Sequence, residues 1–141
     1  MNRDEIKKII PHREPMLLVD TLEWDGEGKI HGTYQVTGDE FFLQGHFPGN
    51  PVVPGVILCE IMAQSSCLLV ASALEGRTPF YGGLDKVRFK KQVKPGDLID
   101  VHAHITNRRG LIFYVHAEAK VKGELSVTGE LTFVLVDNDK L

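Results

Sequence analysis

Hydrophobic and polar residues alternate along several segments of the chain. Segments 98–106 and 111–121 each place their apolar residues on one face, and segment 125–136 alternates in the same way. Segment 29–37 is a further example. An alternation with a period of two is typical of a strand with one buried face. Because short turns join segments 98–106, 111–121 and 125–136, the pattern predicts an antiparallel sheet.

One long apolar segment does not follow this alternation. Of residues 56–74, VILCEIMAQSSCLLVASAL, 14 of 19 are apolar. They predict one helix that begins at Gly55 and runs to about Leu74, where Glu75 and Gly76 close it. A helix that is apolar nearly all round must be buried on most sides. A curved sheet is the element most able to cover it.

The remaining segments complete a single α+β domain over residues 1–141. A short amphipathic helix is expected at residues 3–10, stopped by Pro11, with further strands at residues 16–25 and 80–93. The prediction is one long central helix wrapped by a curved, mostly antiparallel sheet of about six strands, which is the hot-dog arrangement. A single sheet of this kind leaves an edge or a face uncovered, so we expect the chain to form dimers.

Composition narrows the class of protein. With 43% apolar and 25% charged residues the chain is globular, and a net charge of −3 argues against general nucleic-acid binding. We expect no signal peptide, no membrane span and a cytoplasmic location, because the N-terminus lacks an apolar core and the apolar helix contains polar residues. Cys59 and Cys67 lie ~12 Å apart along that helix, too far for a disulfide, and are expected to be free thiols.

Candidate chemistry gathers in the loop before the helix, QGHFPGNPVVP, residues 44–54. Its three prolines each fix φ, and its two glycines permit tight turns or close backbone approach. A linker does not need to hold its shape in this way. The loop is therefore predicted to be rigid and to hold His46 near the start of the helix.

Three chemical parts lie within fifteen residues. His46 is a candidate general base, since its ordinary pKa lies near neutrality. The backbone N–H groups near Gly55 and Val56, at the helix start, are a candidate site for a developing negative charge. Glu60 is a candidate acid whose pKa burial is expected to raise, and Gln64, one turn on, is placed to orient it. A base, an acid and an enolate stabiliser suit elimination of water from a 3-hydroxyacyl thioester, which needs no metal or organic cofactor.

The sequence also leaves open that the same residues have only a structural role. A histidine in a loop often has no catalytic role, and a salt bridge to an arginine would also explain Glu60. The helix can also direct Glu60 away from its own loop, so His46 and Glu60 need not meet within one chain.

The stretch GHFPGNPVVPGVILCEIMAQ closely resembles the signature of FabZ-type 3-hydroxyacyl-[acyl-carrier-protein] dehydratases. IIPHREPMLLVD and GGLDKVRFKKQVKPGDLI resemble two further segments of that family, so the likeness covers most of the chain. The resemblance implies a hot-dog fold, dehydration of acyl chains carried on acyl carrier protein, and a role in fatty-acid biosynthesis. It also implies a homodimer with shared active sites, which often assembles further into a hexamer.

The resemblance assigns roles by position. His46 matches the catalytic histidine and Glu60 the catalytic acid, contributed by opposite protomers. Gly55 matches the glycine whose N–H binds the thioester carbonyl, and Val52 matches the residue whose carbonyl orients the histidine ring. Related dehydratase-isomerases usually carry aspartate and, shortly after, tryptophan, where this chain has Glu60 and Ala63, which favours plain dehydration.

Two departures from the family pattern lie in the N-terminal segment, where Glu14 and Met16 occupy positions at which aromatic residues are common. Two other functions remain open beside dehydration. A hot-dog thioester hydrolase would need a positioned water, and a non-catalytic acyl-binding module would need neither His46 nor Glu60.

Two polar clusters have weaker assignments. A basic cluster in residues 85–94 is a candidate docking surface for the acidic carrier protein, although a solvated strand face is the more ordinary explanation. Its members are Lys86, Arg88, Lys90, Lys91 and Lys94, and Arg3, Lys7 and Lys8 are further candidates. A pairing of His102 with His116 would gather three imidazoles including His104, but ordinary polar surface explains them better than zinc.

Overall fold

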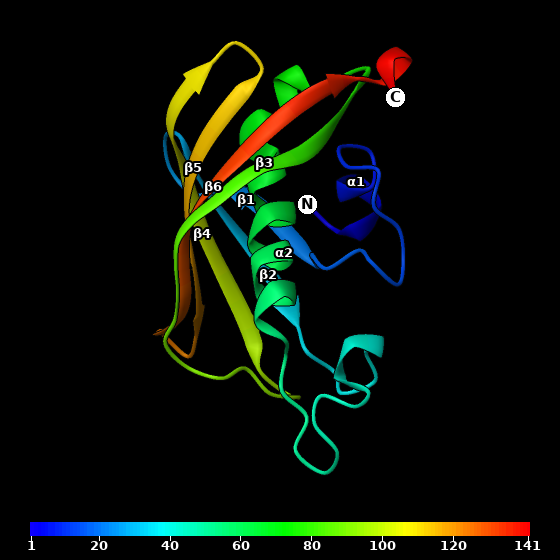
Figure 1. The fold of residues 1–141 in the computed structure, drawn as a ribbon, viewed down its shortest axis with the longest axis vertical. Helices are drawn as coiled ribbons and strands as arrows, with labels where there is room; N and C mark the ends of the chain where they lie inside the picture. Colours follow the sequence, from blue (N-terminus) through cyan, green and yellow to red (C-terminus); the bar gives the residue numbers. More distant parts are fainter.

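The computed structural model describes residues 1–141 and shows one curved sheet wrapped around one central helix (Figure 1). Six antiparallel strands follow the order β1-β2-β4-β5-β6-β3. The strands are β1 (Thr21–Trp24), β2 (Lys29–Gln35), β3 (Arg77–Phe89), β4 (Leu98–Arg109), β5 (Ile112–Val121) and β6 (Glu124–Asp137). The helices are α1 (Arg3–Ile6) and α2 (Gly55–Ser66), with 3-10 helices η1 (Phe41–Leu43), η2 (Cys67–Ala73) and η3 (Asn138–Lys140). The predicted arrangement of sheet and helix is confirmed.

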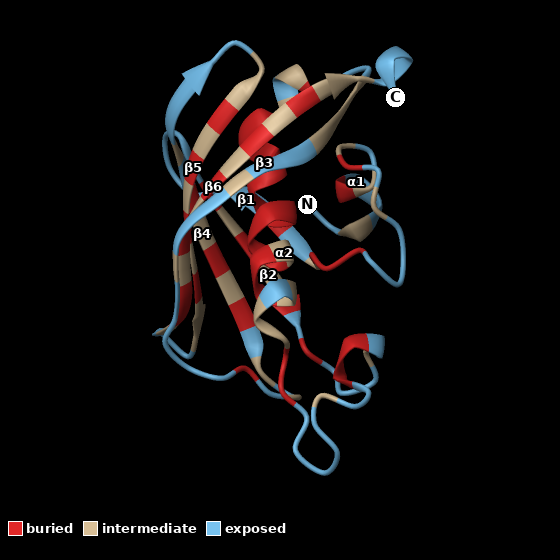
Figure 2. Cartoon of the chain, in the orientation of Figure 1, coloured by how far each residue is buried: buried red, intermediate tan, exposed pale blue.

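The alternation along the strands decides which face of the sheet meets the helix. On β4 the buried residues are Ile99, Val101 and Ala103, and their neighbours point away from the core. Bands of buried and partly exposed residues alternate along the strands in the same way in Figure 2. The concave face thus forms one wall of the hydrophobic core, as the period of two predicts.

The helix α2 is the centre of the fold. It contacts β2, β4, β5 and β6, and Ile61 and Met62 are fully buried. The helical segment Gly55–Ala73 has the length and composition of a membrane span, with mean hydropathy 1.8, but 67% of it is buried inside the fold. Cys59 and Cys67 are both buried and free, as predicted.

The regular helix is shorter than predicted. It ends at Ser66 rather than near Leu74, and the chain continues as the 3-10 helix η2. At this point the Ser66 hydroxyl donates to the Met62 carbonyl oxygen at 2.7 Å, and the Cys67 thiol contacts the carbonyl of Ala63 at 3.5 Å. Side chains that bond to the carbonyl four residues back compete with the backbone ladder and favour such a change of winding.

The N-terminal elements are also shorter than predicted. The helix expected over residues 3–10 is regular only over Arg3–Ile6, and the strand expected over residues 16–25 begins at Thr21. The apolar residues before Thr21 do not alternate, because Leu17, Leu18 and Val19 are all buried in succession. This extended segment packs against α2 instead of joining the sheet, since the Leu18 amide donates to the Gln64 side chain.

Candidate active site

The loop that carries His46 precedes α2 in the chain and lies at the N-terminal end of this helix (Figure 1). The Nδ1–H of His46 donates to the carbonyl oxygen of Val52 at 3.0 Å, and the Val52 amide donates back to the His46 carbonyl at 2.9 Å. The Phe47 ring stacks on the imidazole with centroids 4.2 Å apart. This is the Val52 contact that the family resemblance implies. It fixes the ring and leaves Nε2 of a neutral imidazole free to accept a proton.

The helix start supplies N–H groups close to this loop. No side chain caps α2, which begins at Gly55 after Pro54. The first amides of a helix have no carbonyl partner within it, and the helix dipole adds a partial positive charge. A Cβ atom at Gly55 would lie 2.8 Å from the ring of Phe89, so the absence of a side chain permits this close approach. Val56, the second helical residue, is 77% exposed.

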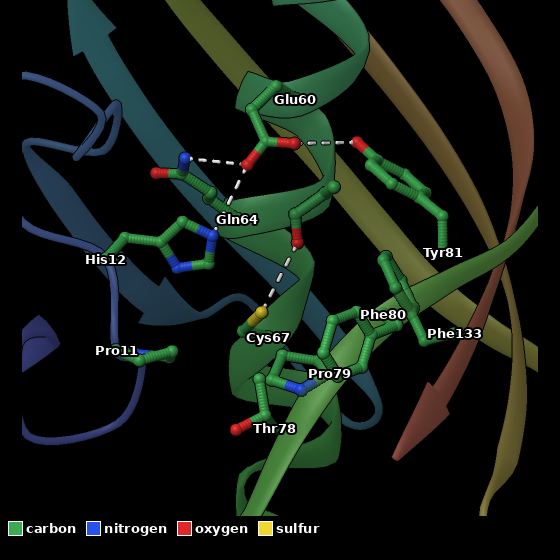
Figure 3. Close-up of a pocket in the computed structure, with 11 residues that line it drawn as sticks. Pro11, His12, Glu60, Gln64, Cys67, Thr78, Pro79, Phe80, Tyr81 and Phe133 are labelled. Atoms are coloured by element: carbon green, nitrogen blue, oxygen red, sulfur yellow. Dashed lines mark hydrogen bonds and ion pairs between the residues drawn. The ribbon is translucent and has the colours of Figure 1, made fainter. Parts of the chain in front are cut away.

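Glu60 faces a cavity of about 300 Å³ between α2, β3 and the N-terminal segment (Figure 3). Most of its walls are apolar or aromatic. The lining residues besides Glu60 are Pro11, His12, Ala63, Gln64, Cys67, Thr78, Pro79, Phe80, Tyr81 and Phe133. His46 is not among them, so this cavity of one chain holds only Glu60 of the two candidate catalytic groups.

Three side chains hold the Glu60 carboxyl (Figure 3). Gln64 donates to Oε2 at 2.8 Å, and Nε2 of His12 lies 3.4 Å from the same oxygen. The Tyr81 hydroxyl donates to Oε1 at 3.1 Å. The predicted contact between Gln64 and Glu60 is therefore present, and Gln64 itself is only 1% exposed.

These partners correct the expected ionisation of Glu60. Burial acts to raise the pKa of its carboxyl, but the hydrogen bonds from His12, Gln64 and Tyr81 lower it, and the net pKa lies below the usual range. The prediction of a raised pKa is wrong for this chain, because it considered burial without the donors. His12 and Tyr81 were missed from the sequence, where they lie in segments read only as a family-like N-terminal stretch and as a strand.

The proposed docking cluster is exposed on β3 and the turn after it. Lys86, Arg88, Lys90 and Lys91 all face solvent, and Lys91 is ion-paired with Glu124.

The further N-terminal candidates differ from this cluster, because Arg3 and Lys7 are neutralised locally. Arg3 lies 2.6 Å from Asp20, and Lys7 lies 2.9 Å from Glu14. The hydrogen bond from Lys7 lowers the pKa of Glu14 to about 2. The unusual Glu14 thus serves an ion-pair cluster where an aromatic residue is common.

The strand register decides which histidines lie opposite one another on the outer face of the sheet. His102 lies opposite Glu118, and His104 lies opposite His116. The pairing of His102 with His116 that would gather three imidazoles does not form, because β4 continues to Arg109 and its ladder with β5 shifts register between Ile105 and Asn107. No group of three or more His, Cys, Asp or Glu side chains has an arrangement suited to a metal ion.

Comparison with known sequences defines the family. The FabA-like domain family matches residues 10–130. The 3-hydroxyacyl-[acyl-carrier-protein] dehydratase FabZ of Clostridium perfringens is 47% identical over 137 residues, which cover 96% of this chain and 99% of that protein. The enzyme of the same name from Caldicellulosiruptor bescii is also 47% identical, over 95% of this chain and 98% of its own length.

Solved structures show the same fold at lower identity. The dehydratase heterocomplex ApeI:P from Xenorhabdus doucetiae matches with a TM-score of 0.82 at 19% identity, over 95% of this chain and 92% of that one. A putative thioesterase from Ralstonia eutropha matches with a TM-score of 0.65 at 21% identity, over 81% and 83% of the two chains.

The sheet wrapped around one helix places the chain in the hot-dog structural class, the fold it shares with these solved structures. Within that class the chain belongs to the FabA-like family, as a hydro-lyase of the FabZ 3-hydroxyacyl-[acyl-carrier-protein] dehydratase type.

Proposed function

We propose that this chain dehydrates 3-hydroxyacyl-[acyl-carrier-protein] to the trans-2-enoyl thioester in cytoplasmic fatty-acid biosynthesis. In the reaction Nε2 of His46 takes the α-proton, and the electrons of the broken C–H bond form the new double bond. The β C–O bond breaks, and the hydroxyl leaves as water with a proton from Glu60. N–H groups at the Gly55 and Val56 end of α2 stabilise the enolate oxygen. The carrier protein supplies the substrate on its phosphopantetheine arm.

This proposal rests on the observation that His46 and Glu60 are each held in position for proton transfer. The Val52 carbonyl holds His46 with Nε2 free, and Gln64 holds Glu60 in an apolar cavity. A hydrolase would need a positioned water in place of a leaving hydroxyl. The hydrogen bonds that lower the pKa of Glu60 stabilise the carboxylate that remains once the proton has been given to the departing hydroxyl.

The two groups complete one site when a second protomer is present. β3 is an edge strand with four exposed large apolar side chains, Phe80, Tyr81, Leu84 and Phe89, of which Phe80 and Tyr81 line the Glu60 cavity. An exposed apolar edge of this kind favours pairing with a second copy of the chain. We therefore infer a homodimer in which His46 of one protomer serves Glu60 of its partner, with a hexamer as a trimer of dimers.

Mass spectrometry of a 3-hydroxyacyl carrier protein incubated with the pure protein tests the chemistry. The expected result is loss of one water by the wild type and no loss with His46→Ala or Glu60→Gln. The matched control is His104→Ala, which removes an exposed histidine on the far face of the sheet and retains activity. Release of free carrier thiol would instead identify a hydrolase. An unchanged, bound substrate would identify a binding module. A dehydrated product that chromatography resolves from the trans-2-enoyl standard at the same mass would add isomerisation.

Mixing the two inactive variants tests whether the site is shared. After dissociation and random reassociation of His46→Ala with Glu60→Gln, half of the dimers are mixed and each holds one intact site. Activity should then recover to about a quarter of the wild-type value. No recovery in dimers shown to exchange subunits would place both groups of each site in one chain.

A further inference from the structure

The Tyr81 hydroxyl is the one side-chain donor on Oε1 of Glu60. It lies 3.1 Å from that oxygen and 3.2 Å from the carbonyl oxygen of Cys59. The other two partners of the carboxyl, His12 and Gln64, both approach Oε2. In Figure 3 Tyr81 lies across the carboxyl from these two residues. Each oxygen of Glu60 is therefore held from a different part of the fold.

The sheet fixes the direction from which Tyr81 reaches Glu60. Tyr81 pairs with Phe133 of β6, and their rings stack with centroids 6.1 Å apart. The ladder between β3 and β6 shifts register between Tyr81 and Gly83. The aromatic contact and the strand pairing hold the ring before any substrate arrives, so that its hydroxyl is pre-organised at the carboxyl.

Glu60 gains a full negative charge when it gives its proton to the departing hydroxyl. A donor held at Oε1 stabilises this ionised form more than the protonated form, and so it acts on the transition state for proton transfer. Burial raises the pKa of the Tyr81 hydroxyl, and the neighbouring Glu60 charge raises it further, so Tyr81 stays protonated as a donor. The other titratable groups at the carboxyl are His12 and the thiols of Cys59 and Cys67.

We propose that Tyr81 is a positioning residue that stabilises the Glu60 carboxylate as the acid releases its proton, and that it acts through Glu60 without touching the reacting atoms. The inference rests on the proposed role of Glu60 as the acid. It gives the Tyr81 hydroxyl a role in the reaction, whereas the sequence pattern alone identifies Tyr81 only as a residue of a strand.

Tyr81→Phe tests the inference, since it removes one oxygen and keeps the ring. We expect the limiting kcat, taken from the plateau of the pH profile where Glu60 carries its proton, to fall about tenfold, as for the loss of one hydrogen bond to a charged group, with KM within about twofold. The matched control is Tyr114→Phe on β5, whose hydroxyl makes no hydrogen bond within the chain and which should keep wild-type kinetics. Equal melting temperatures for both variants separate the effect from misfolding.

A second readout needs no turnover. Carboxyl-labelled glutamate, with the Glu60 signal assigned by its loss in Glu60→Gln, gives the titration of this carboxyl by carbon-13 NMR. Tyr81→Phe should raise the pKa of Glu60, and Tyr114→Phe should leave it unchanged. An unshifted titration, or an unchanged kcat, in a dehydratase that is otherwise active would overturn the Tyr81 inference alone. A wild type without dehydratase activity but with a shifted titration would overturn the proposed reaction instead, and with it the catalytic role of the contact.

Discussion

The Nδ1 atom of His46 lies 3.0 Å from the backbone carbonyl oxygen of Val52, six residues further along the same loop. A carbonyl oxygen only accepts hydrogen bonds, so the ring must carry its proton on Nδ1. The basic nitrogen of the neutral ring is then Nε2. The loop thereby selects both the orientation and the tautomer of the candidate base.

The first prediction concerns this tautomer. Nitrogen-15 NMR of histidine-labelled protein at pH 8 should show His46 with its proton on Nδ1, because the Val52 carbonyl requires a donor there. His104 is the internal reference, since it is exposed and makes no hydrogen bond within the chain. A His46 ring protonated on Nε2 would contradict the proposed role of Nε2 as the base.

The second prediction concerns the contact between β2 and α2. A Cβ atom at Gly32 would lie 2.7 Å from Oγ and 2.9 Å from Cβ of Ser65, in the fully buried core. Gly32→Ala should therefore lower the free energy of unfolding by about 1–3 kcal/mol, measured by urea denaturation. Gly83→Ala is the matched control in β3, where the nearest atom would be Thr132 at 3.9 Å. Equal unfolding midpoints for the two variants would contradict the tight packing.

The alternating strands are the part of the fold that the sequence predicts best. The buried faces of β4 and β5 are as expected, because a period of two specifies which side chains share a face. The segment before Thr21 was misassigned because three apolar residues in succession do not distinguish a strand from a buried extended segment. The end of α2 was misplaced because its change of winding depends on side-chain bonds from Ser66 and Cys67.

The contacts of the candidate site were also predicted only in part. The loop chemistry predicted a held histidine and the helix spacing predicted the contact of Gln64 with Glu60, since both depend on nearby residues. The contacts of His12 and Tyr81 with Glu60 depend on segments 48 and 21 residues away. Only the tertiary fold brings these donors to the carboxyl, and together with Gln64 they reverse the direction of its pKa shift.

The third prediction concerns pH and the outer face of the sheet. The hydrogen bond to Glu130, at 2.7 Å, and the neighbouring Glu118 raise the pKa of His116. A raised histidine pKa contributes stability that is complete below the unfolded value of about 6.5 and is lost as pH rises through the folded value. The difference in unfolding free energy between the wild type and Glu130→Gln should be larger at pH 5.5 than at pH 8.5. A difference that does not change with pH would contradict this ion pair.

The last prediction concerns the basic cluster on β3 and the turn after it. Arg88 and Lys90 are exposed and make no ion pair with a carboxylate, whereas Lys91 is paired with Glu124. If these charges dock the acidic carrier protein, Arg88→Glu/Lys90→Glu should raise KM for the acyl carrier substrate about tenfold at low salt. The effect should shrink at about 0.5 M salt, where exposed charges are screened. Initial rates over a series of carrier-protein concentrations measure it.

A substrate without the carrier protein separates docking from catalysis. With a short acyl thioester on free pantetheine the double variant should match the wild type, because the acyl chain and thioester meet the same cavity. Lys29→Glu is the control. It makes one such charge change on β2, which β4, β5 and β6 separate from β3 in the sheet, and it should leave the kinetics with both substrates unchanged. An equal loss with carrier-bound and free substrates would assign the cluster to the stability of β3 or its edge contact, because docking charges act only when the carrier protein is present.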